Sequence, residues 1–597
     1  MRRLLPLLLL FLACGKSASG PAVHSRFDPD AALKQRDFFA LPFPTDLRRT
    51  ATGLDLTGFP NPTRSQLLSD YVIAMREQQG FGLASALYVA FDGPIDPATV
   101  TADSVYVVDL QTGDRTPLQT KWFGQASLYV PANTLALLPV FGVPLHEGHV
   151  HALVVTDAVH DAHGAPIGPA PVMAQALQGQ GAAAEVTRPF RENVQHAQHV
   201  ALASVFTAQD PSPTLVKLRG AVRATPVPTP TGVSCSDAGP YTLCTGQFPV
   251  PNFQTGTPPY LSSGGRLALD ASGVPVVQRT ESVRFALTVP KGAGPFPVVL
   301  YEHGTGGDFE SFVSEGLAAD LAARSIAAVS MDQVLHGPRN PDCWPPTSAY
   351  ETCVGTAYFN FVNPWAGRDN TRQGAADGFQ LLRLVQELKN AGQPLDAAHV
   401  AFLGHSQGGL TGAPFVAAEP ELKGAVLSGT GGTIAITVLV RKDPLDFKAV
   451  AELLLGIDGK ESLEPFHPAL VLIQTFGEPA DPITSGRHLA KEPLGGGARS
   501  ILLTEGLLDP YTSSSASEAL GAAALFDIGG TAAHESDGFL FRGLAVDPLP
   551  HAVPAGSGLL LQFPNDGHFA IFDNPTARRQ VMGFLQTALQ GAARVDP

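Results

Sequence analysis

The sequence predicts a mixed α/β fold, in which a mostly parallel sheet flanked by helices follows a smaller all-β sandwich. In the C-terminal part, apolar strand-like runs alternate with helix-like segments, an order typical of βαβ units. In the N-terminal part, short apolar stretches are separated by Gly, Pro and Asp turns, which is typical of a β-sandwich. The 61 glycines and 52 prolines among 597 residues also argue against a helical bundle.

Charge and hydrophobicity limit the possible classes of function. The 39 basic and 54 acidic residues give a formal net charge of −15. Nucleic-acid binding requires a cationic surface, so no nucleic-acid partner is expected. Hydrophobic residues make up 44% of the chain and charged residues 16%, which excludes a disordered chain and allows a large core.

The N-terminus carries a candidate export signal, predicted over residues 1–13. After a basic start, the apolar run over residues 4–13 is too short to span a bilayer, which requires about 20 residues. The run ends in Phe11-Leu12-Ala13-Cys14-Gly15, which resembles a bacterial lipobox. The resemblance implies that Cys14 is lipidated and that residues 14–30 tether an exported lipoprotein to a membrane, at the outer membrane or cell surface. An ordinary cleaved signal with an incidental cysteine is the alternative.

Four further cysteines remain, namely Cys235, Cys244, Cys343 and Cys353. Their spacings of 9 and 10 residues predict two local disulfides, which an exported protein can form. A four-cysteine zinc site is the alternative, but the sequence contains no Cys-x-x-Cys pair.

The N-terminal domain is predicted over residues 31–214. The segment Phe91–Val100 resembles the opening of bacterial Ig-like modules, and Val159–Ile167 resembles their closing strand and turn. Within this domain, the run His146-Glu147-Gly148-His149-Val150-His151 suggests a metalloprotease at first sight. The zinc motif requires histidines four residues apart on a helix, whereas these are separated by three and five residues and interrupted by Gly148. We therefore predict no metal.

The second domain is predicted over residues 215–597, with an insertion around residues 336–368. This aromatic-rich insertion is either a lid or an ordinary packed segment. The predicted strands are Val283–Val289, Pro297–Glu302, Ile326–Met331, His399–Leu403, Gly424–Ser428 and Leu559–Phe563. The predicted helices are Phe309–Arg324, Asn370–Lys389, Ser515–Ala524 and Ala570–Ala588.

Ser406 is the candidate nucleophile of this domain. It lies in Gly404-His405-Ser406-Gln407-Gly408, a G-x-S-x-G sequence directly after an apolar strand and before a helix. In this context the motif predicts a tight, strained turn that exposes the serine hydroxyl beside a helix N-terminus.

A second loop supports this assignment. The buried strand ending at Glu302 runs into His303-Gly304-Thr305-Gly306-Gly307. With Ser406, this loop resembles the α/β-hydrolase superfamily, in which such a loop and the residue after the nucleophile supply two oxyanion-binding amides. The resemblance implies that the backbone N–H groups of Thr305 and Gln407 take this role.

The base and the acid are expected downstream, in the order Ser, Asp, His. His568 follows an apolar strand and precedes the final helix, so it is the candidate base, and His551 is the weaker alternative. Asp509 follows the buried strand 499–506 and is the candidate acid. Asp481 lies in a similar Asp-Pro turn and is the alternative acid.

The chain combines a lipoprotein leader, the segment Phe43-Pro44-Thr45-Asp46, an Ig-like module and a hydrolase domain with the turn Gly404–Gly409. This layout resembles bacterial surface lipases and esterases of the virulence-factor-lipase type. The resemblance implies a serine esterase or lipase that acts on small-molecule or lipid esters and needs no cofactor. A serine peptidase, a polyester depolymerase and a non-catalytic surface binding protein are the alternatives. Nothing in the sequence indicates whether the protein forms oligomers.

Overall fold

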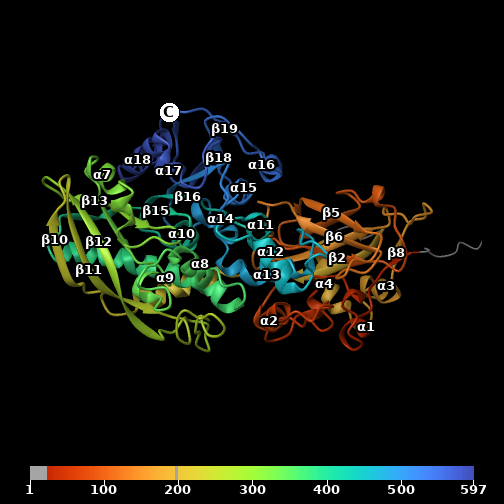
Figure 1. Ribbon diagram of the computed structural model, residues 1–597. Coiled ribbons are helices and arrows are strands. Elements are labelled where there is room, and N and C mark those ends of the chain that lie inside the picture. Colours follow the sequence, from red (N-terminus) through yellow and green to blue (C-terminus); the bar gives the residue numbers. More distant parts are fainter. Residues whose placement is uncertain (1–22, 195–198) are drawn as a thin grey trace, which may run out of the picture.

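The computed structural model describes residues 23–194 and 199–597 (Figure 1). The predicted signal over residues 1–13, Cys14 and the first part of the predicted tether lie outside these residues. Residues 23–30 do not form the predicted tether, because Val23 and Phe27 are buried in a hydrophobic core, with exposed fractions of 6% and 4%. Within the described ranges, no helix has both the length and the hydropathy needed to cross a membrane.

An eleven-stranded sheet forms the centre of the C-terminal part. Its strands, in spatial order, are β10 (Thr231–Asp237), β11 (Tyr241–Asn252), β12 (Arg279–Pro290), β14 (Ala327–Met331), β13 (Phe296–Glu302), β15 (Leu395–His405), β16 (Leu422–Ser428), β17 (Ser500–Gly506), β21 (Ser557–Phe563), β18 (Asp527–Gly529) and β19 (Val546–Asp547). The strands β10, β11, β12 and β14 pair antiparallel, whereas all pairs from β14 to β19 are parallel. The carboxyl ends of β13, β15, β17 and β21 therefore meet at one edge of the sheet.

Helices cover both faces of this sheet. Alternate strand residues point to opposite faces, so Leu300 and Phe402 pack on one side and Val299 and Ala401 on the other. The first side is covered by α5 (Ser212–Arg223), α9 (Pro364–Asn390), α10 (Gln407–Ala418), α14 (Pro482–Ala490) and α15 (Ser514–Ala523). The second side is covered by α6 (Ser311–Ser314), α7 (Leu317–Ala322), α17 (Ala570–Asp573) and α18 (Pro575–Leu589).

The predicted strands of this domain are all present, but two predicted helices are each divided. The helix expected over 309–324 breaks at Gly316, whose φ of 80° is left-handed, and the final helix breaks before Pro575. The predicted boundary between residues 214 and 215 falls in the first turn of α5. The second domain is therefore the predicted α/β unit, with its helices on both faces of one sheet.

The N-terminal part contains two small antiparallel sheets. One consists of β2 (Leu87–Ala90), β6 (Thr134–Pro139) and β5 (Leu118–Phe123). The other consists of β4 (Arg115–Thr116), β3 (Val105–Asp109), β7 (Val150–Thr156) and β9 (Val200–Thr207). Within the described residues these sheets are accompanied by the helices α1 (Pro29–Leu33), α2 (Gln66–Ala74), α3 (Pro171–Leu177) and α4 (Ala184–Asn193).

The structure does not confirm a separate all-β Ig-like module. Helices α12 (Phe447–Leu455) and α13 (Pro468–Gly477) come from the connection between β16 and β17, yet their apolar residues belong to the same core as β2 and β6. In Figure 1 these helices lie against the N-terminal sheets. The N-terminal sheets and these insertion helices thus share one hydrophobic core.

Two connections of the α/β domain are long. The predicted insertion around residues 336–368 contains α8 (Tyr350–Tyr358), and the disulfide Cys343–Cys353 joins this helix to the loop before it. The β16–β17 connection, which begins with α11 (Ile434–Val440), is a second insertion that the sequence analysis did not identify. The other predicted disulfide, Cys235–Cys244, links the paired strands β10 and β11.

Candidate active site

Ser406 occupies the turn between strand β15 and helix α10. Its backbone has φ 55° and ψ −119°, in the left-handed half of the map where a residue with a side chain is strained. Its amide donates to the carbonyl of Ser428 at 2.8 Å, which ties the turn to the end of β16. The turn therefore holds the hydroxyl at the carboxyl edge of the sheet, beside the N-terminus of α10.

Close backbone contacts explain two glycines around this turn. A Cβ on Gly404 would lie 2.3 Å from the carbonyl oxygen of Gly408, and a Cβ on Gly408 would lie 2.0 Å from that of Glu302. Both distances are far below van der Waals contact, so only glycine allows β15, α10 and β13 to approach this closely. The motif thus brings Ser406 next to the loop that follows β13.

His568 and Asp509 form a buried hydrogen-bonded pair. Nδ1 of His568 lies 2.6 Å from Oδ2 of Asp509, and the two side chains are 3% and 1% exposed. Oδ1 of Asp509 accepts from the amides of Tyr511 and Thr512, each at 2.8 Å. The fixed carboxylate keeps Nδ1 of the imidazole as the donor, so Nε2 carries the lone pair of the neutral ring.

Two rings pack against His568. The ring of Tyr511 stacks on it at a centroid distance of 4.7 Å, and the ring of His405 lies 4.9 Å away. Burial lowers the pKa of His405 well below its usual value, so this neighbour is uncharged. Ser406, Tyr511 and His568 line one small cavity. Within the described residues no hydrogen bond joins Ser406 to His568, and in enzymes such bonds often shorten only when substrate binds.

Thr305 and Gln407, the predicted oxyanion donors, are tied to each other. Oγ1 of Thr305 donates to Oε1 of Gln407 at 2.9 Å. Gln407 is the first residue of α10, where an amide has no acceptor within its own helix. The amide of Thr305 donates no hydrogen bond within the described part of the chain. Both amides are therefore available to a ligand beside Ser406.

Two buried histidines hold the loop that carries Thr305. Nδ1 of His303 donates to the carbonyl of Gly304 at 2.7 Å, and its Nε2 accepts from the amide of Gln333 at 3.2 Å. Nε2 of His336 accepts from the amide of Gly306 at 3.1 Å. Burial lowers the pKa of His303 to about 4 and that of His336 to about 3. Both rings are therefore neutral at pH 7, as an acceptor nitrogen requires.

His336→Gln is expected to destabilise the protein most at neutral pH and less in mild acid. An unfolded histidine titrates near pH 6.5, whereas the pKa of His336 in the folded chain is about 3. Between these values the unfolded chain binds the extra proton, so this residue's contribution to stability falls by about 1.4 kcal/mol per pH unit as pH is lowered. The Gln variant lacks this titration. The difference between the two urea midpoints should therefore narrow from pH 7 to pH 5, and a constant difference would contradict a neutral His336.

The alternative acid and base have other partners. Oδ1 of Asp481 accepts from the amide of Thr433 at 2.9 Å, and Oδ2 accepts from the amide of Ile434 at 2.8 Å. The buried carboxylate of Asp481 therefore caps the backbone amides at the start of helix α11. His551 lies on the short strand β20 (His551–Ala552), where its Nε2 is 3.4 Å from Oδ2 of Asp547.

Arg441 and Glu351 also line the cavity at Ser406, although no sequence motif predicts them there. The guanidinium of Arg441 lies over the rings of Phe359 and Phe447, at 4.7 and 4.9 Å from their centroids. Burial lowers the pKa of Arg441 to about 10. Both residues come from the two long insertions, where no motif marks a residue as part of the site.

Comparisons with known proteins give distant structural neighbours only. No protein-family model matches the chain, and no curated protein matches it. Acetyl xylan esterase 1 from a Thermoanaerobacterium species aligns over 63% of this chain and 93% of its own, at 14% identity and a TM-score of 0.38. A cold-adapted esterase from an Arctic intertidal metagenomic library aligns over 60% of this chain and 99% of its own, at 15% identity and a TM-score of 0.31.

Proposed function

We propose that the protein is an exported serine hydrolase that cleaves carboxylic esters through an acyl-enzyme. The observation that carries this proposal is the His568–Asp509 pair, whose imidazole lines the same cavity as the strained Ser406. A nucleophile, a base and a group that orients the base are the parts that nucleophilic catalysis by serine needs. All three follow the carboxyl ends of parallel strands in one sheet, namely β15, β17 and β21, and α/β sheets bind their ligands at this edge.

In the proposed mechanism His568 moves the protons. Its Nε2 takes the proton of Ser406 as the hydroxyl oxygen attacks the ester carbonyl, and the resulting imidazolium is stabilised by Asp509. The imidazolium then protonates the departing alcohol oxygen, which leaves Ser406 acylated. A water molecule, deprotonated by His568, attacks the acyl-enzyme, and return of the proton to Ser406 releases the carboxylic acid.

The amides of Thr305 and Gln407 would stabilise the tetrahedral oxyanion in both steps. The side-chain hydrogen bond between these residues fixes the two donors relative to each other before substrate arrives. Loss of one such donor typically costs about 10²–10³ in rate. Because the donors are already in place, little reorganisation is needed in the transition state.

Apolar cavities beside Ser406 favour an ester with a hydrophobic part. Arg441 lines both the cavity at Ser406 and a second cavity that contains Phe359, Phe361 and Phe447. The same three phenylalanines line a third, mainly apolar cavity next to helix α11. Acyl chains bind in cavities of this kind by burial of their methylene groups.

Phe361→Trp is expected to lower the activity on long acyl chains selectively. Phe361 is half-buried and lines both apolar cavities. A tryptophan ring there would fill space that the methylene groups of a long acyl chain otherwise occupy. Each excluded methylene costs about 0.8 kcal/mol, roughly fourfold in kcat/KM. The ratio of decanoate to acetate hydrolysis measures the effect, and the acetate rate of the same variant is the internal control. An unchanged ratio would show that the acyl chain does not bind in these cavities.

We also propose that Cys14 is lipidated and holds the enzyme at a membrane, near lipid esters. A single lipid chain gives only marginal binding, so stable anchoring needs a further chain or signal. Metabolic labelling with a lipid precursor in cells, compared with Cys14→Ser, tests this part of the proposal separately from the catalytic part.

A fluorophosphonate probe and a panel of p-nitrophenyl esters test the catalytic part. We expect the probe to label one serine and the esters from acetate to palmitate to be hydrolysed, with an optimum that separates esterase from lipase. Cleavage of peptide or polyester substrates instead would establish one of the alternative hydrolases. Neither labelling nor hydrolysis would favour a surface binding protein on this fold.

A further inference from the structure

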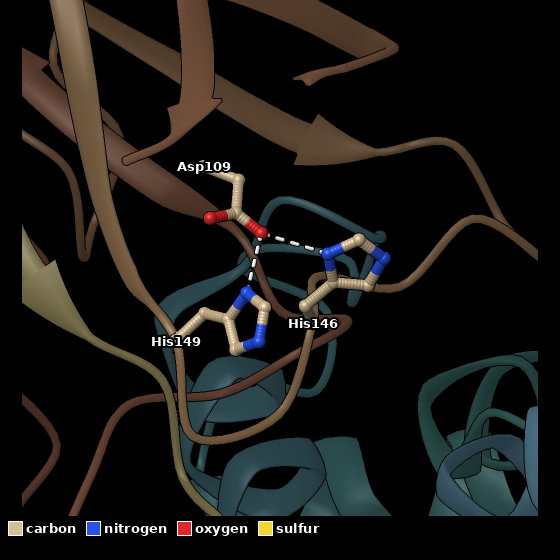
Figure 2. Close-up of side chains that lie close together, drawn as sticks. All are labelled: Asp109, His146 and His149. Atoms are coloured by element: carbon tan, nitrogen blue, oxygen red, sulfur yellow. Dashed lines mark hydrogen bonds and ion pairs between the residues drawn. The ribbon is translucent and has the colours of Figure 1, made fainter. Parts of the chain in front are cut away.

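A second cluster of reactive side chains lies in the N-terminal part. Asp109 ends strand β3, and His146 and His149 lie on the connection between β6 and β7. Nδ1 of each imidazole is 2.7 Å from the same oxygen, Oδ2 of Asp109 (Figure 2). The three potential ligand atoms all lie within 4.8 Å of one another. Two imidazoles therefore converge on one carboxylate oxygen.

We propose that Asp109, His146 and His149 bind a divalent transition-metal ion, with Zn²⁺ as the ion that fits their donor set. Zn²⁺ is commonly held by imidazole nitrogens and carboxylate oxygens, and three protein ligands leave one position of the tetrahedron open. Ca²⁺ and Mg²⁺ prefer sites made of oxygen atoms alone, so two imidazoles disfavour them. The site is independent of Ser406 and of the proposed hydrolase function.

The cluster needs only a small adjustment to accept the ion. Around tetrahedral Zn²⁺ the ligand atoms lie about 3.4 Å apart, so each imidazole has to withdraw from Asp109 by about 0.7 Å. The side chains of His146 and His149 are 31% and 33% exposed and come from a loop, which allows this movement. Nδ1 binds the ion only without its proton, so a ring that donates from Nδ1 moves that proton to Nε2 by exchange with solvent.

The carboxylate is already oriented for this role. Oδ1 of Asp109 accepts from the amide of Gln111 at 2.8 Å and from that of Thr112 at 3.3 Å, which leaves Oδ2 for the ion. The side chain is 3% exposed and cannot rotate away into solvent. Such second contacts are typical of metal ligands, because they fix the direction of the donor atom.

His146 and His149 border an open cavity. His146 and His149 line this cavity together with Glu147 and His488, and its volume is about 560 Å³. Nε2 of His488, on helix α14, lies 2.7 Å from Oε1 of Glu147. The loop that supplies both histidines is thus attached to the α/β domain, and an ion there has an entry path and room for a non-protein ligand.

The experiment is a Zn²⁺ titration of the whole mature protein after chelator treatment, in competition with a chromophoric chelator. We expect one tightly bound Zn²⁺ per chain, a rise in Tm on Zn²⁺ addition, and no displacement by excess Mg²⁺ or Ca²⁺. His146→Ala and His149→Ala should each weaken the affinity at least about 100-fold. Co²⁺ in place of Zn²⁺ should give the visible absorption of a low-coordinate nitrogen and oxygen site.

His199→Ala is the matched control. His199 also pairs through Nδ1 with a carboxylate, Asp157 Oδ2 at 2.8 Å, but this pair is largely exposed. The His199→Ala substitution should leave Zn²⁺ binding unchanged. If either alanine variant fails to fold, His146→Gln and His149→Gln keep a polar side chain at these half-buried positions and should still weaken Zn²⁺ binding, with the metal-free Tm of each variant measured alongside. Binding that is absent, or equal in the wild type and the cluster variants, would overturn the proposal.

Discussion

Ser406→Ala is expected to lower kcat/KM for p-nitrophenyl butyrate by about 10⁴-fold or more. The alanine has no oxygen to form the acyl-enzyme, so only a direct attack by water on the bound ester remains. Residual catalysis then comes from substrate binding and from the amides of Thr305 and Gln407. The variant should also lose all fluorophosphonate labelling, measured as the mass of the intact protein.

Ser515→Ala is the control for this experiment. Ser515 is exposed on helix α15, in the segment that follows Asp509, and its hydroxyl bonds to that of Ser513. The Ser515→Ala substitution removes a serine hydroxyl in the same region but not from the cavity at Ser406. Equal activity of Ser406→Ala and wild type would show that a different group performs the hydrolysis, even if the fold and its stability are unchanged.

Local sequence predicted the parts of the site that depend on short-range geometry. The strand, the turn and the helix around Ser406 follow from glycines that permit backbone contact, and these glycines are adjacent in sequence. Asp509 and His568 each follow a buried strand, and parallel pairing of β17 with β21 brings the ends of those strands together. A prediction of this kind needs only the order of the strands.

Contacts between distant segments could not be predicted in the same way. Helices α12 and α13 are apolar on their own, but nothing local indicates that they complete the N-terminal core. Asp109 precedes His146 by 37 residues, so the spacing argument that excludes a helical zinc motif says nothing about this third donor. The prediction that no metal binds considers only the run 146–151, namely its spacing and the interruption by Gly148.

The two candidate acids provide the second large prediction. Asp509→Asn is expected to reduce kcat by about 10⁴-fold with little change in KM, whereas Asp481→Asn should leave kcat near the wild-type value and lower the urea midpoint. Asp481 accepts hydrogen bonds from backbone amides at the start of α11 and of α14, so its charge supports local structure. Steady-state kinetics and urea denaturation of both variants separate the two roles.

The hydrogen bonds of Asp509 explain why so small a change should have so large an effect. In Asp509→Asn the side-chain oxygen is retained by the amides of Tyr511 and Thr512, so the new NH₂ group must face His568. A donor in that position forces Nδ1 of His568 to accept, and the ring proton moves to Nε2. The nitrogen that should take the proton of Ser406 then already carries one. Catalysis is lost through the wrong tautomer while the fold is preserved, and an Asn variant with near-normal kcat would show that Asp509 does not orient the base.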